Sequence, residues 1–373
     1  MRSLLKFELY KIFSQKSIWI TLIIIFLGLS AITLSSTSTS YGDSVEDTVA
    51  AWDKLEGDLS EERISKLKDE LNKMDVENLS SPKEKAYGNT ISNILFEDFE
   101  YSNFKERKAA LEQEIQSLNN SNGTNYEELE LKLSMLEKVD LNTTMFNLGP
   151  TNIIDNLETF FVIFTALLLI IGLSSVFSKE TGTGMNQIIL SSTHGRKKVT
   201  SAKLLAAVIY VLFIVGIQII YNVGINTLLY TGQGWDSPLQ KIMRFNESPY
   251  AFNLLEYFST QMILHTLFSI GFAILIILIS SLSKTSVQSI IISSIIFVIP
   301  LILYGFSITN FENYIRYGYI YLMTVDHFFV SFKTYNIFGT IILEPYVVTI
   351  VFVLVTVIFA LLLYPIQKKR QVS

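Results

Sequence analysis

The chain of 373 residues contains no cysteine, so disulfide bonds, thiol nucleophiles and cysteine-based metal sites are excluded. It has only three histidines, at positions 194, 265 and 327, which are too few and too scattered to predict a metal cluster. No Gly-x-x-x-x-Gly-Lys-Ser/Thr segment occurs, so the sequence holds no phosphate-binding loop of that type. These absences exclude several kinds of enzyme and direct attention to the long hydrophobic runs.

Half of the residues are hydrophobic and the mean hydropathy is +0.39, which indicates an integral membrane protein. Six apolar runs are each long enough to cross a hydrocarbon core of about 30 Å. They cover residues 18–34, 157–177, 204–229, 260–282, 286–306 and 346–366. The predicted fold is therefore an all-α membrane protein with six transmembrane helices. No run holds a carboxylate near its centre, which argues against proton or sodium coupling by this chain alone.

Basic residues gather in four of the segments that join or flank these runs. Segments 1–17, 178–203, 283–285 and 366–373 hold thirteen Lys and Arg residues against two acids, Glu8 and Glu180. The rest of the chain holds 32 acids and 16 basic residues. Since Lys and Arg favour the inner side of a membrane, we expect these segments and both termini to be cytoplasmic in a multi-pass protein of the cell membrane.

The first 17 residues interleave basic and apolar side chains. Arg2, Lys6, Lys11 and Lys16 alternate with leucine, isoleucine and phenylalanine, which predicts an amphipathic helix at the cytoplasmic interface. The alternative is a cleavable secretory signal, which also begins with basic residues and an apolar run. The long amphipathic start and the nearly full-length run favour a retained helix.

Residues 35–156 form a hydrophilic, acidic insertion between the first two runs. Apolar residues recur at three-four spacing in three stretches, which end near positions 74, 118 and 136, and this spacing is typical of amphipathic helices. The low-complexity segment 119–125 predicts a turn between two of them. We expect an extracytoplasmic helical hairpin or small bundle; the alternative is that these helices only act as a spacer.

Two further segments are expected on the outer side. Residues 230–259 form an outer loop. Residues 307–345 are rich in tyrosine and phenylalanine and poor in charge, which predicts short, non-spanning helices that dip into the outer interface. An ordinary aromatic belt at the membrane surface is the alternative.

Segment 178–203 carries glycines and charges in an order that resembles a known family. The residues concerned are Glu180, Gly182, Gly184, Ser191, Arg196 and Lys203. Together with the amphipathic start, the six runs and the short helices before the last run, they resemble the permease subunit of bacterial ABC exporters of the type V (ABCG-like, ABC-2-type) fold. The large insertion is absent from the shorter members, although sodium-exporter-like permeases resemble this chain in having one.

The resemblance implies that segment 178–203 is a cytoplasmic coupling loop that contacts an ATPase. It assigns charged contacts to Glu180 and Arg196 and an apolar anchor to Ile188 and Ile189. Gly182 and Gly184 are also expected at this ATPase contact, and as glycines they allow the backbone to turn there. The resemblance further implies a non-catalytic chain without its own cofactor, paired with a second permease, identical or homologous, and with two cytoplasmic ATPase subunits that bind ATP and Mg²⁺. Membrane lipid surrounds such a chain, and no nucleic acid is expected.

On this reading the chain exports an amphipathic or hydrophobic cargo, such as a peptide, an antibiotic or a lipid-like molecule. The alternative is a non-transporting membrane scaffold or sensor whose outer helical domain binds a cell-envelope or peptide partner. An intramembrane enzyme is disfavoured because no nucleophile, ligand set or acid pair stands at membrane depth. Partnership with an ATPase distinguishes the first two hypotheses.

Polar residues inside the runs are candidates for a substrate pathway. Gln218 and Asn222 recur four residues apart and share one helix face, while Ser289 and Ser293 do so in the fifth run, which also holds Pro300. In lipid, such side chains commonly bond to a neighbouring helix, so a packing role is the main alternative. For His265 a neutral ring bonded to a neighbouring helix is expected rather than a functional charge.

Overall fold

The computed structural model describes residues 1–35, 44–74, 81–118, 124–185, 187, 196–305 and 312–369. Within these residues, six helical segments are long and apolar enough to cross a membrane, which confirms the predicted number. They are α2 (Lys16–Ser35), α8 with α9 (Val162–Leu173 and Ser175–Gly182), α11 (Lys197–Tyr230), α12 (Leu254–Leu282), α13 (Ser286–Gly305) and α17 (Glu344–Lys369). Several extend beyond the apolar runs, because backbone hydrogen bonding continues where hydropathy falls.

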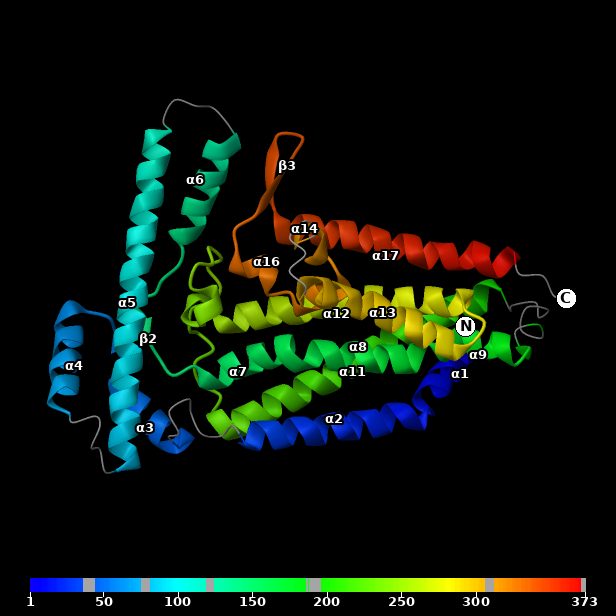
Figure 1. Ribbon diagram of the computed structural model, residues 1–373, viewed down its shortest axis with the longest axis horizontal. Coiled ribbons are helices and arrows are strands. Elements are labelled where there is room, and N and C mark those ends of the chain that lie inside the picture. Colours follow the sequence, from blue (N-terminus) through cyan, green and yellow to red (C-terminus); the bar gives the residue numbers. More distant parts are fainter. Residues whose placement is uncertain are drawn as a thin grey trace.

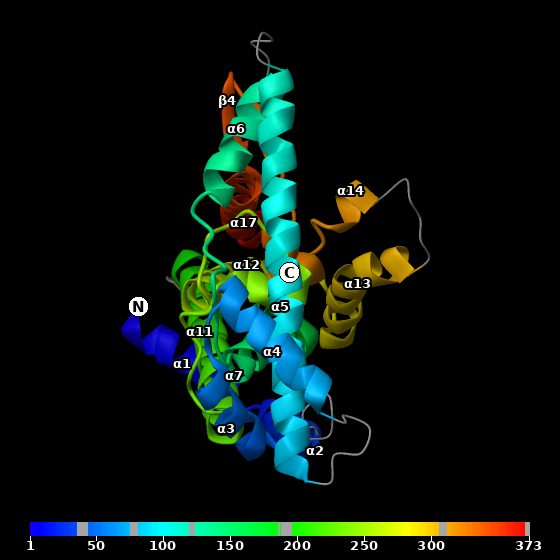
Figure 2. The same cartoon turned by 90° about the vertical axis from the view of Figure 1, so that its left-hand side faces the viewer.

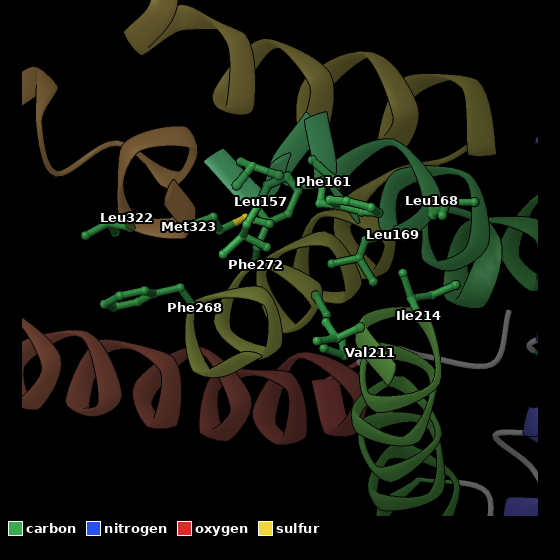
Figure 3. Close-up of a cluster of buried hydrophobic side chains, with 14 of the residues drawn as sticks. Leu157, Phe161, Leu168, Leu169, Val211, Ile214, Phe268, Phe272, Leu322 and Met323 are labelled. Atoms are coloured by element: carbon green, nitrogen blue, oxygen red, sulfur yellow. The ribbon is translucent and has the colours of Figure 1, made fainter. Parts of the chain in front are cut away.

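The six helical segments alternate in direction along the long axis of the molecule (Figure 1). Helix α12 and the α8–α9 segment are the most buried of them, and α12 contacts α8, α11, α13 and α17. Figure 3 shows Phe268 and Phe272 of α12 among side chains of α8, α11 and α15 (Tyr319–Thr324), and both rings are fully buried. Close helix packing also depends on Gly271, where an added Cβ would lie 2.2 Å from the ring of Phe352 on α17.

The helix that contains the second apolar run changes type where that run begins. Helix α7 (Leu148–Asn156) passes through one turn of π-helix, η1 (Leu157–Phe161), before α8 begins at Val162. Within the π turn, the Val162 N–H bonds to the Leu157 carbonyl, five residues back. Helix α7 packs against α11, so the end of the insertion belongs structurally to the membrane bundle.

The insertion is helical, as its periodicity predicts. It contains α3 (Val45–Leu55), α4 (Glu61–Lys73), the 36-residue α5 (Pro82–Ser117) and α6 (Thr124–Leu136). A short antiparallel pair, β1 (Gly57–Asp58) with β2 (Thr143–Thr144), ties its two ends together. Two small hydrophobic clusters form its core, one around Ile91 and one around Phe104. Most of the predicted turn at 119–125 lies outside the described residues.

Helix α5 stands across one end of the bundle (Figure 2) and is fixed to the connection between α11 and α12. That connection contains two 3₁₀ turns, η2 (Leu239–Lys241) and η3 (Met243–Phe245). The ammonium of Lys241 lies 2.7 Å from the Glu97 carboxylate of α5, and Arg107 lies 3.2 Å from Glu247. The insertion is therefore held to the membrane bundle by buried and exposed ion pairs.

Segment 312–343 folds into short helices followed by a hairpin. The helices are α14 (Glu312–Ile315), α15 and α16 (His327–Val330), and the strands are β3 (Thr334–Ile337) and β4 (Thr340–Leu343). The short helices agree with the sequence-based expectation, whereas the hairpin was not predicted. Phe328 and Phe329 are buried inside the protein, so these two rings serve as core residues and do not face lipid as a belt would.

Candidate functional site

Helix α1 (Arg2–Phe13) packs across α11 at the end of the bundle that carries both termini (Figure 1). Glu8 and Ile12, four residues apart, share its buried face. Phe7 and Tyr10 are 55% and 70% exposed on the opposite face. The predicted N-terminal helix is thus present, while its location in the membrane interface stays a prediction.

Four charged side chains from three helices meet beneath α1. The ammonium of Lys203 on α11 lies 2.8 Å from Oε1 of Glu180 on α9 and 3.3 Å from Oε2 of Glu8 on α1. Lys11 lies 2.9 Å from Glu8 and 2.6 Å from Glu180. We call Glu8, Lys11, Glu180 and Lys203 the charge cluster. Its two ammonium groups and two carboxylates give a formal charge of zero.

Lys203 is the centre of the charge cluster. Its side chain is 0% exposed, and its ammonium also donates to the Val176 carbonyl at 2.6 Å and lies 4.6 Å from the ring centroid of Phe177. An isolated buried ammonium is strongly unfavourable, so these oxygen contacts are necessary for its placement. The cluster therefore binds α1, α9 and α11 into one unit.

Lys11 lies at the more accessible edge of the charge cluster, with 28% of its side chain exposed. Burial alone would lower the pKa of Lys11, but hydrogen bonds and Coulombic attraction to Glu180 and Glu8 raise it above its ordinary value. Lys11 is therefore charged at neutral pH. Its i, i+3 spacing from Glu8 places both groups on one face of α1.

A serine from α12 holds the break between α8 and α9. The hydroxyl of Ser280 accepts hydrogen bonds from the N–H groups of Phe177 and Ser178, each at 3.1 Å, and donates to the Ser174 carbonyl at 2.7 Å. In an uninterrupted helix, those N–H groups would pair with carbonyls four residues earlier. Ser178 also donates to Ser286 of α13 at 3.2 Å. Helix α9 thus contacts α12 and α13 as well as the charge cluster.

The residues expected to contact an ATPase have different environments. Gly182 and Gly184 are exposed, and Gly184 has a φ of +72°, which a residue with a side chain rarely adopts. Arg196 donates to the Lys368 carbonyl at 2.9 Å, near the end of α17. Ile188, Ile189 and Ser191 lie outside the described residues.

Glu180, which is expected to be a charged contact of the ATPase, is mostly buried within the chain. It is 7% exposed, and its carboxylate is occupied by Lys203 and Lys11. Its direct contact with an ATPase stays a prediction. The geometry instead places this carboxylate at the junction of α1, α9 and α11.

The polar residues of α11 face α7 and α8. Gln218 accepts from the Thr165 hydroxyl at 2.8 Å, and Asn222 donates to the Ile153 carbonyl at 2.8 Å. Both are buried, and the cavity beside them measures about 10 Å³, close to the lower limit for one water molecule. These contacts favour the packing role, and their part in a pathway stays a prediction.

The pathway candidates of α13 are buried within the chain. Among the described residues, the hydroxyls of Ser289 and Ser293 have no hydrogen-bond partner although both are 0% exposed. Pro300 lies inside α13 and packs on Gly318, where an added Cβ would be 2.3 Å from Cγ of the proline. The two unpartnered hydroxyls leave the pathway hypothesis open for this helix.

His265 agrees with the neutral, hydrogen-bonded alternative. Its Nδ1 lies 2.8 Å from the Met323 carbonyl and its Nε2 lies 3.2 Å from the Thr165 hydroxyl. The part of the chain that the structure describes contains no group of three His, Asp or Glu residues suited to holding a metal ion.

Sequence reasoning missed Glu8 and Lys11 as partners of the segment 178–203. Glu8 is the only acid in the first 17 residues and Glu180 is the only acid in 178–203, so each had the signature of a residue with a specific basic partner. The pairing itself spans about 170 to 195 positions, and no local pattern predicts it.

Comparison with known families gives one match. The family model described as ABC-2 family transporter protein matches residues 16–362, which is most of the chain. Among curated proteins and among solved structures, no match was found. With six candidate spans and a match over most of its length, the chain belongs to the ABC-2 family of transporter proteins, whose membrane permeases are non-catalytic subunits that work with ABC ATPase subunits.

Proposed function

We propose that this chain is the permease half of an ATP-driven exporter in which the charge cluster transmits movement of the ATPase to the membrane helices. The observation that carries the proposal is the placement of Glu180. It lies on α9, within the segment 178–203 that is expected to meet the ATPase, and it is joined by ion pairs to Lys11 on α1 and Lys203 on α11.

The mechanism follows from the contacts of α9. The 178–203 segment begins within α9, which ends at Gly182, so a displacement of the segment moves α9 directly. The buried ion pairs then move α1 and α11 with α9, since separating them would leave charges without partners in a low-dielectric environment. Arg196 links the other end of the segment to the end of α17 through its bond to the Lys368 carbonyl.

The proposed complex is oriented by charge. We place the termini, the 178–203 segment and the charge cluster in or next to the cytoplasm, and the insertion outside a cell membrane, supported by the excess of Lys and Arg in the inner segments. Two ATPase subunits, which bind ATP and Mg²⁺, and a second permease, identical or homologous, complete the assembly.

The proposed cargo is amphipathic or hydrophobic. The spans present apolar surface with isolated hydroxyls and amides, and no carboxylate stands near the centre of a span. Ser289 and Ser293 are the preferred contacts in this chain, because their buried hydroxyls lack partners among the described residues. A peptide, an antibiotic or a lipid-like molecule fits this surface.

The experiment is purification of the chain from its native membrane in a mild detergent, followed by mass spectrometry and an ATP-hydrolysis assay. The proposal expects a co-purifying ABC ATPase whose turnover depends on the permease and is changed by Glu180→Lys. Lys179→Gln, a change at the exposed neighbouring position, is the matched control for altered charge. Recovery of the intact chain without any nucleotide-hydrolysing subunit would favour the scaffold or sensor hypothesis.

A further inference from the structure

A cavity of about 620 Å³ lies where the insertion meets the membrane bundle. Its upper wall comes from α6, including Met135, and from Lys138, which lies just after that helix. Its lower wall comes from the first turns of α12 and α17, including Leu264 and Ile350. Figure 2 shows α6 beside β4 and close to α17, and α6 contacts β4. The volume falls within the range of about 300 to 1,000 Å³ typical of small-molecule sites.

The cavity is apolar over most of its lining and reaches the lipid-facing surface. Phe329 and Leu264 contribute apolar side chains to it. Ile350 is 60% exposed on α17, and Ile263, the neighbour of Leu264 on α12, is 68% exposed. Both helices are candidate spans, so this side of the cavity faces the hydrocarbon region near the ends of the spans. An apolar chain can enter from the membrane without crossing water.

The polar groups of the cavity indicate which head group an amphiphilic ligand would carry. Among the described residues of the lining, Lys138 is the one that carries a charge, and it is exposed at the rim. Tyr250 also lines the cavity; it is 6% exposed, and its hydroxyl has no hydrogen-bond partner among the described residues. Burial raises the pKa of Tyr250, so its hydroxyl remains a neutral donor. A cation and a free donor, with no carboxylate in the part of the lining that the structure describes, favour an anionic group.

We propose that this cavity binds an amphiphile with one apolar chain and an anionic head, which enters from the outer part of the membrane and places its head near Lys138 and Tyr250. The insertion then forms half of a ligand site, which goes beyond a role as a spacer. This binding does not depend on ATP or on the partner ATPase, so it goes beyond the transport function proposed above.

The test uses the full-length chain in nanodiscs of zwitterionic lipid, with a photoreactive palmitate as the probe. We expect saturable labelling of peptides that contain Tyr250, Leu264 or Ile350. Leu264→Trp fills the cavity and should weaken labelling about tenfold, whereas Ile263→Trp, which faces lipid one position earlier, should leave it unchanged. About tenfold is the loss expected when a well-buried apolar contact is removed from a site.

A second pair of variants tests the contact with the head group. Both substitutions lie outside the candidate membrane spans. Lys138→Gln should weaken the apparent affinity about fivefold, since one nearby cation contributes about 1 kcal/mol toward an anionic head. Lys85→Gln, at an exposed position of α5, is the control. A probe with the same chain and a trimethylammonium head should label at least about fivefold less.

Three outcomes would overturn the proposal: labelling that does not saturate, equal labelling of Leu264→Trp and Ile263→Trp, or equal labelling by the anionic and cationic probes. Ile350→Trp paired with Val351→Trp repeats the comparison on α17, so a folding defect of one variant does not decide the result. Failure of ATPase co-purification would leave this binding test unaffected, and the two proposals can therefore fail separately.

Discussion

Replacing Lys203 by methionine should destabilise the protein strongly, because methionine matches the length of the lysine stem but removes the buried ammonium. Glu180 and Glu8 would then be left with Lys11 as their one remaining cationic partner in the charge cluster, and Lys11 is 28% exposed. Removing one partner of a buried ion pair costs about 3 to 5 kcal/mol. We expect Lys203→Met to lower the free energy of unfolding by an amount in that range.

The distances also predict which of the two carboxylates contributes more to stability. Glu180 contacts both ammonium groups, at 2.6 and 2.8 Å, whereas Glu8 lies 2.9 Å from Lys11 and 3.3 Å from Lys203. Glu180→Gln should therefore destabilise the protein more than Glu8→Gln. A common readout is equilibrium unfolding by sodium dodecyl sulfate in mixed micelles.

The matched control for Lys203→Met is Lys197→Met, which changes an exposed lysine on the same helix. Surface substitutions usually change stability by less than about 0.5 kcal/mol. If Lys203→Met and Lys197→Met unfold at the same detergent fraction, the charge cluster does not hold α1, α9 and α11 together.

Two further predictions concern packing and pH. Gly271→Ala should destabilise the protein by about 1 to 3 kcal/mol in the same unfolding assay, because its Cβ would clash with Phe352. At Gly216 an added Cβ meets nothing within 4 Å, so Gly216→Ala should be neutral. Equal effects of the two variants would contradict this packing. Burial lowers the pKa of His327 to about 4, and Asp326 opposes this only in part. As pH falls from about 6.5 to about 4, the unfolded chain binds a proton at His327 that the folded chain does not, so the free energy of unfolding should fall. His327→Phe should remove this part of the dependence of stability on pH. If the dependence is unchanged in His327→Phe, the ring is not buried in its uncharged form.

The fold was predictable where one local property decides the structure. A long apolar run that crosses a membrane must form a helix to satisfy its backbone hydrogen bonds. The three-four spacing of apolar residues in the insertion indicates amphipathic helices. The π turn at 157–161 was not predictable, because it interrupts an apolar run without any proline or glycine. The start of the second span at residue 157 stays a prediction, since the helix continues through this turn.

The hairpin of β3 and β4 shows a second limit. Its two-residue turn, Phe338–Gly339, has φ values of +54° and +86°. Such a turn normally carries asparagine or aspartate before glycine, and phenylalanine gives no such signal. Phe338 is fully exposed at the tip of the hairpin. The aromatic composition of the segment therefore indicated residues in the membrane interface and not a hairpin on the surface.

The sequence indicated where the candidate site lies along the chain, but it did not indicate which residues surround Glu180. The isolated acid in a basic segment marked Glu180 as special, but the residues that surround it come from α1 and α11. Such contacts depend on how helices far apart in the sequence pack together. The buried geometry shows that Glu180 joins α9 to α1 and α11, while its direct contact with an ATPase stays a prediction.

The most direct test of the central claim is a charge exchange between Glu180 and Lys203, measured as permease-dependent ATP turnover of the complex in nanodiscs. Glu180→Lys and Lys203→Glu should each lower this turnover, and the double variant should recover a large part of it, because the cluster again balances two carboxylates against two ammonium groups. Additive losses without recovery would contradict the account, since they would mean that Glu180 acts independently of Lys203, as a direct contact of the ATPase would.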